Sequence, residues 1–156
     1  MKLFHLNENV HYTNKMLLNT YGMLQHTEPK PNGITEIYIL KMHLCVERLL
    51  SEILQKSPNV SKKTLQSNFA AKRDEVEKLF DSDVYGGLFS KVYTLNRIRN
   101  EIAHNLESKK YQLLLQKFDE RIEVQSGYEL TDDSMLILKK QLSDLYALLL
   151  ALKESM

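Results

Sequence analysis

The sequence predicts an all-α protein that forms a single domain over residues 1–156, a bundle of four to six helices with one small β-hairpin near residues 121–130. Three observations carry this prediction. Glycine and proline are scarce, with five and three copies, and they gather at short breaks between long segments. Apolar residues within those segments recur mostly at helical spacing. A length of 156 residues also suffices to bury a core without metals or disulfides.

Three helices are expected before residue 81. The first covers about Asn14 to Gln25 and precedes a break at Pro29 to Gly33. The second runs from Thr35, a residue type that caps helices, to Lys56, and it is apolar around most of its circumference, as a central helix should be. The third is expected from Ser61 to Phe80, with an apolar face formed by Leu65, Phe69, Val76 and Leu79.

A fourth helix is expected from about Val84 to His104, and a short fifth from Ser108 to Phe118. The pair Gly86-Gly87 resembles the other breaks and is expected close to a helix boundary. On a helical wheel at about 100° per residue, the core face of the fourth helix consists of Val84, Leu88, Val92, Leu95, Ile102 and Leu106.

The hairpin and a last helix complete the chain. Ile122 and Val124 alternate with polar residues, a turn is expected at Ser126-Gly127, and the alternation resumes afterwards. Thr131 is then expected to cap a helix with a continuous apolar seam. Further leucines widen that seam, so this helix is either fully buried in the bundle or shared between the core and a dimer interface.

Charge and cysteine content restrict the class of protein. The 21 basic and 20 acidic side chains give a formal net charge of +1, so any binding of a polyanion has to be local. Residues 88–112 supply a local bias, with five basic side chains against two acidic ones. The single Cys45 cannot form an intrachain disulfide, and no apolar run is long enough to span a bilayer. A cytoplasmic protein without membrane association is expected.

Residues 97–104 carry the richest chemistry, with the sequence R-I-R-N-E-I-A-H. Arginine offers a permanently charged fork for phosphate oxygens, and histidine exchanges protons near neutral pH. On the wheel a stripe opposite the core face contains Tyr93, Arg97, Asn100 and His104. A structural interpretation competes, since basic residues and asparagine are also typical of a helix end.

Arg99 lies off this stripe, close to the apolar face of the fourth helix, where an unpaired guanidinium would be costly. Glu47 of the second helix is a candidate acceptor, in a polar line with His43 and Ser51. Arg99 then braces the fold, unless the helix unwinds near Asn100 and Arg99 turns toward the cleft of His104. The sequence leaves open whether Arg97 or Arg99 shares a cleft with His104.

Metal or cofactor chemistry is not expected. The histidines are scattered, and no pair has the spacing of a zinc-binding helix with an intervening glutamate. No helix-turn-helix pair with a basic second helix is evident either.

The segment Arg99 to His104 resembles the R-x(4-6)-H motif of HEPN domains in its R-N-x-x-x-H form, and Arg97 to His104 meets the longer spacing. The motif lies near the end of a long helix, after a leucine-rich helix that contains the acidic Glu47, and the resemblance covers most of the chain. It implies a HEPN-like bundle, and in catalytic members a metal-independent ribonuclease with a composite cleft between two domains.

The resemblance implies specific roles. Arg99 would hold the scissile phosphate, Asn100 would orient the site, and His104 would transfer a proton as a ribose 2′-hydroxyl attacks phosphorus, with Arg97 and Tyr93 in the cleft. Such proteins act in toxin–antitoxin systems, phage defence and CRISPR interference. The implied partners are a second copy in a homodimer, an RNA substrate, and an antitoxin or another protein.

A second branch of the resemblance implies a different function. Regulators similar to the mannitol operon repressor share a comparable helical core, an Arg-Asn and Ala-His segment, and are not catalytic. No tyrosine follows His104 at the short spacing of some HEPN toxins, because Asn105 and Leu106 stand there. The alternative is therefore a non-catalytic helical regulator or protein-interaction module.

Overall fold

The computed structural model describes residues 34–104, 109–124 and 130–156. Within these ranges the chain forms helices and no strand, which confirms the all-α class. The expected helix from Asn14 to Gln25 lies outside the described residues. The described helices are α2 (Ile34–Lys56), α3 (Lys62–Leu65), α4 (Phe69–Glu77), α5 (Ser82–His104), α6 (Lys109–Phe118) and α7 (Asp132–Ser155).

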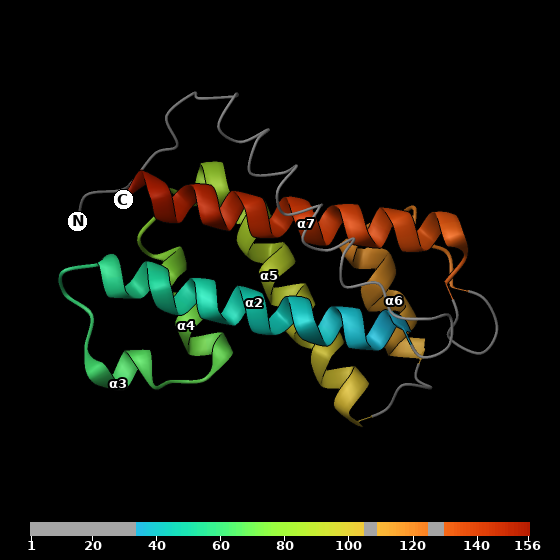
Figure 1. The fold of residues 1–156 in the computed structure, drawn as a ribbon, viewed down its shortest axis with the longest axis horizontal. Coiled ribbons are helices and arrows are strands. Elements are labelled where there is room, and N and C mark those ends of the chain that lie inside the picture. The colour runs from blue at the N-terminus through green and yellow to red at the C-terminus, as the bar shows by residue number, and fades with distance from the viewer. Residues whose placement is uncertain (1–33, 105–108, 125–129) are drawn as a thin grey trace.

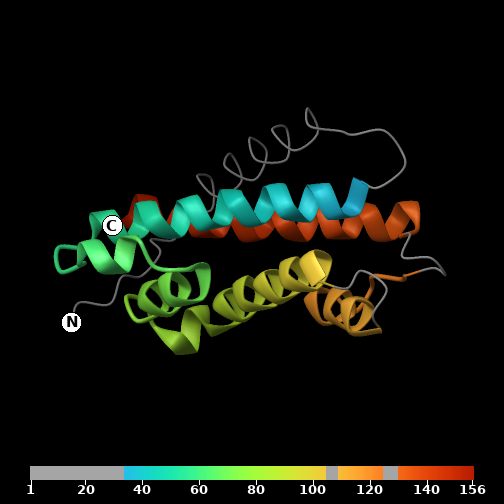
Figure 2. The ribbon, with the colours of Figure 1, turned by 90° about the horizontal axis from the view of Figure 1, so that it is seen from below.

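Two layers of helices make up the described part of the chain. Helices α2 and α7 lie side by side in one layer, and α4, α5 and α6 lie in the other (Figures 1 and 2). The two long helices of the first layer run in the same direction. At one end the ammonium of Lys139 lies 5.6 Å from the ring centroid of Tyr38, and at the other Lys153 lies 3.2 Å from Glu52.

The core lies between the two layers and draws on both. Apolar side chains that are almost inaccessible to solvent come from α2, α4, α5, α6 and α7, and they form one contiguous cluster. The leucine seam of α7 is buried as predicted, at Leu138, Leu142, Leu145, Leu149 and Leu152. Removing this much apolar surface from water is the main favourable contribution to folding.

The single helix expected from Ser61 to Phe80 is wrong, because the structure has α3 and α4 with a break between them. Asn68 starts α4, where its side-chain oxygen accepts a hydrogen bond from the backbone N–H of Ala71 at 3.0 Å. Ser67 donates back to the carbonyl of Thr64 at 2.6 Å. Polar side chains at these positions form hydrogen bonds with backbone groups that would otherwise bond within a helix. The spacing of apolar residues contains no information about these hydrogen bonds, so it did not predict the break.

The expected core face of α5 is rotated from the observed one. Val84 is 61% exposed, whereas the next residue, Tyr85, is buried together with Phe89. Val92 and Leu95 are buried as predicted, while Leu106 lies outside the described residues. Gly86 and Gly87 do not mark a boundary, since both lie inside α5.

The segment before α7 is held to that helix by polar contacts. The backbone N–H of Glu123 donates to the buried hydroxyl of Ser134 at 2.7 Å, and an isolated antiparallel bridge joins Val124 to Leu130. The turn of the expected hairpin lies outside the described residues, so the hairpin remains a prediction. Thr131 caps α7 as predicted, accepting from the N–H of Ser134 at 3.1 Å. None of the described helices has the length and apolar content needed to cross a membrane.

Candidate functional site

The predicted polar stripe lies on the solvent side of α5. Tyr93 is 40% exposed, Asn100 and His104 are exposed, and Arg97 is half-buried. These residues follow one another at steps of four, three and four, so their side chains share one side of the helix. His104 is the last residue of α5, where the negative end of the helix dipole favours a cation.

Two arginines from different helices contact the ring of Tyr93. The guanidinium carbon of Arg97 lies 5.7 Å from the ring centroid, and that of Arg73, on α4, lies 5.0 Å from it. Both distances are within the range of a cation–π interaction. Sequence reasoning missed Arg73, because only the packing of α4 against α5 brings it to this ring.

Carboxylates neutralise part of the positive charge around the stripe. Arg73 forms ion pairs with Asp74 and, at 3.8 Å, with Glu77. Lys110 at the start of α6 pairs with Glu101. In the described part of the chain, Arg97 and Arg99 have no carboxylate within ion-pair distance. These two arginines therefore remain available for an anion.

Arg99 does not pair with Glu47, which corrects the candidate pairing from the sequence. Its guanidinium donates instead to the side-chain oxygen of Asn100 at 3.2 Å. The carboxylate of Glu47 lies 3.3 Å from the ammonium of Lys72, which is 9% exposed. The physical reason is geometric: α4 packs against α2 and brings a buried lysine to Glu47, and that lysine needs a counter-charge.

Behind the exposed stripe lies a buried polar contact that the sequence did not predict. His43 of α2 is 5% exposed, and its Nε2 lies 3.0 Å from the carboxamide oxygen of Asn96 on α5. The imidazole also stacks on Phe69, with ring centroids 4.1 Å apart. Burial lowers the pKa of His43, and the opposing effect of the Asn96 hydrogen bond is smaller. A neutral imidazole that donates to Asn96 fits this environment.

A signal for this contact was present in the sequence. Asn96 lies among apolar positions of α5, and His43 is the one histidine in the apolar α2. A buried polar side chain requires a partner, so two such residues on central helices are candidates for each other. What the sequence lacked was the relative register of α2 and α5.

The site brings together groups that can hold an anion and exchange a proton. Arg97 and Arg99 supply charge, Asn100 supplies amide N–H donors, and His104 is accessible to an incoming molecule. Metal chemistry has no visible ligand set in the described ranges, because no group of three or more histidine, cysteine, aspartate or glutamate side chains there could hold an ion. No family model, curated protein or solved structure matches this chain.

Proposed function

We propose that this chain is a HEPN-like, metal-independent endoribonuclease that cleaves single-stranded RNA as a homodimer, in the role of a toxin or phage-defence effector. One observation carries the proposal: the exposed end of α5 presents Asn100 and His104, with the guanidinium of Arg99 held against Asn100. An arginine, an amide donor and an accessible imidazole can stabilise charge and transfer a proton during RNA cleavage by an internal nucleophile.

The proposed reaction needs no water and no metal ion. The 2′-oxygen attacks the adjacent phosphorus and loses its proton to a base, and the bond to the 5′-oxygen breaks as that oxygen gains a proton. The products are a 2′,3′-cyclic phosphate and a 5′-hydroxyl. Arg99 stabilises charge on the phosphoryl oxygens, and His104 transfers one of the two protons. The second copy of the chain supplies the opposing set of groups.

Cleavage of a labelled single-stranded RNA in EDTA tests the proposal. We expect products with 2′,3′-cyclic phosphate ends, and loss of cleavage in His104→Ala and Arg99→Ala. Arg48→Ala is the matched control, because the Arg48 side chain is 83% exposed on α2, away from the motif. Because His104 is exposed, alanine there should leave the melting temperature unchanged. Retained cleavage in His104→Ala would refute the catalytic assignment.

One observation favours the alternative, a non-catalytic regulator or protein-interaction module similar to the mannitol operon repressor. Asp74 and Glu77 place negative charge beside Tyr93, which opposes the approach of RNA and suits a basic protein segment. Under this alternative the purified protein cleaves no RNA, and Glu77→Gln weakens binding to a protein partner, such as an antitoxin, in a pull-down from its own host.

A further inference from the structure

A groove separate from the α5 motif lies between the first three turns of α5 and the middle of α7. Its volume is about 380 Å³, near the lower end of the range for small-molecule sites, roughly 300–1,000 Å³. Apolar side chains dominate its lining, among them Val84, Leu88, Leu145 and Leu148. A groove of this size suits a small apolar molecule better than a helix of another protein, which needs a long surface.

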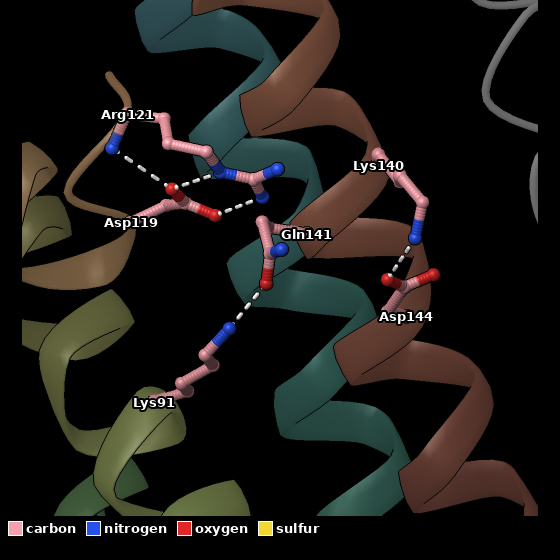
Figure 3. A network of polar contacts seen from close by, with 6 residues as sticks. All are labelled: Lys91, Asp119, Arg121, Lys140, Gln141 and Asp144. Carbon is pink, nitrogen blue, oxygen red and sulfur yellow. Dashed lines mark hydrogen bonds and ion pairs between the residues drawn. The ribbon is translucent and has the colours of Figure 1, made fainter.

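A half-buried ammonium closes one end of the groove. Lys91 of α5 and Gln141 of α7 both line it, and their side chains point toward each other, with Lys91 donating to the carboxamide oxygen of Gln141 (Figure 3). The ammonium also lies 5.6 Å from the ring centroid of Phe118. Both contacts are with neutral groups.

The nearby carboxylates are already engaged by other cations. Asp119 accepts from Arg121 at 2.9 and 2.6 Å, and Asp144, which also lines the groove, accepts from Lys140 at 2.6 Å (Figure 3). Among the described residues, Lys91 has no carboxylate within ion-pair distance. Asp119 acts on Lys91 only through space and is itself paired with Arg121, so the half-buried ammonium keeps positive charge that an anion can complement.

Gly87 leaves open space at the groove wall. A Cβ atom built on it would meet no other atom within 4 Å. Glycine inside a helix is destabilising relative to other residues, and nothing in the surroundings requires it here for close packing. The missing side chain is part of what keeps the groove open.

We propose that this groove binds a small amphipathic carboxylate, with its apolar part against Leu88, Leu145 and Leu148 and its carboxylate on Lys91 and the free amide N–H of Gln141. The site is independent of the proposed ribonuclease, because Lys91 precedes His104 by more than three helical turns on α5. Binding therefore requires neither RNA nor a functional His104.

The first test is calorimetric titration of the full chain with octanoate, 1-octanol and octylammonium. We expect saturable binding of octanoate at least about tenfold tighter than that of octanol, because a charge-assisted hydrogen bond contributes that much, and no binding of octylammonium. Lys91→Met should reduce the octanoate affinity to the octanol level, while Lys41→Met, at an exposed position of α2, should not change it.

The second test fills the groove. Gly87→Leu should abolish binding of both octanoate and octanol without loss of stability, whereas Gly86→Leu, at the neighbouring glycine that does not line the groove, should leave binding intact. Equal affinity for octanoate and octanol, or an unchanged affinity in Lys91→Met, would overturn the proposal. The proposal would also be overturned if the wild-type protein bound no octanoate and Gly87→Leu disrupted its self-association. The groove would then be a contact between two copies of the chain.

Discussion

Arg99 and Asn100 are joined through their side chains, with a guanidinium N–H of Arg99 donating to the carboxamide oxygen of Asn100 at 3.2 Å. Successive residues of a helix point about 100° apart. The contact links Arg99 to the exposed Asn100, while Arg99 still acts electrostatically on His43 of α2. Asn100 lies one turn before His104 on the exposed side of α5. Arg99 is therefore linked through Asn100 to the stripe that ends at His104, while Arg97, itself a member of that stripe, contacts Tyr93.

Removing the Asn100 side chain should release Arg99. If the proposed reaction is correct, Asn100→Ala lowers kcat/KM for labelled RNA by about 100-fold, the usual effect of removing one donor to a developing charge. Asn100→Asp should keep Arg99 in place through an ion pair but present a carboxylate to the phosphate, so cleavage should remain equally low. An Asn100→Asp protein as active as wild type would contradict the role of the amide.

The Glu47–Lys72 pair should stabilise the contact between α2 and α4. Glu47→Gln leaves the buried Lys72 without its counter-charge and should reduce the free energy of unfolding by about 2 kcal/mol, below the range for fully buried pairs because Glu47 is 31% exposed. Urea denaturation measures the loss. Lys72→Met removes the buried charge itself and should reduce the free energy of unfolding by less than Glu47→Gln does. The double variant Glu47→Gln/Lys72→Met should regain much of the stability that Glu47→Gln loses. Additive losses in the double variant would argue against coupling.

Stability should depend on pH through His43. Its pKa in the folded protein lies below the ordinary value of about 6.5, chiefly because of burial. As the pH falls, His43 of the unfolded chain therefore takes up a proton before His43 of the folded protein does. The contribution of the neutral, buried His43 to the free energy of unfolding is complete above about pH 6.5 and is lost as the pH drops toward the lowered pKa.

Charged and polar groups surround His43, so a variant that removes only its titration is the control for this pH dependence. Glu47 on α2 favours the protonated imidazole and Arg99 on α5 opposes it, while Asn96 accepts its hydrogen bond. Urea unfolding of wild type between about pH 7.5 and pH 5.5 should show falling stability. His43→Gln keeps an N–H donor for Asn96 and should flatten that part of the profile. An unchanged slope in His43→Gln would assign the effect to another group.

The cap at Asn68 should account for the start of α4. Asn68→Ala leaves the backbone N–H of Ala71 without its side-chain acceptor and should lower the free energy of unfolding by about 1 kcal/mol. Asn68→Asp retains an acceptor and should stay close to wild type. Circular dichroism of thermal unfolding compares the two variants, and equal melting temperatures for both would show that the break between α3 and α4 has another cause.

By itself the sequence determined the features that depend on neighbours along the chain. The cap at Thr131 and the buried seam of α7 follow from side chains that interact within a few residues of one another. Thr35, expected to cap α2, lies inside that helix, which begins at Ile34. The exposed stripe of α5 belongs to the same class, since helical spacing alone places its four residues on one side. Gly86-Gly87 was misleading because tertiary packing outweighs a weak local preference.

Only the tertiary structure decided which residues meet across helices. It paired Glu47 with Lys72, placed Arg73 on Tyr93, and joined His43 to Asn96. It also chose between overlapping apolar faces of α5, burying Tyr85 and exposing Val84. The physical reason is common to these cases: a helix reveals its own periodicity, but its rotation and register against a neighbour are set by how two surfaces pack, and that information is not local.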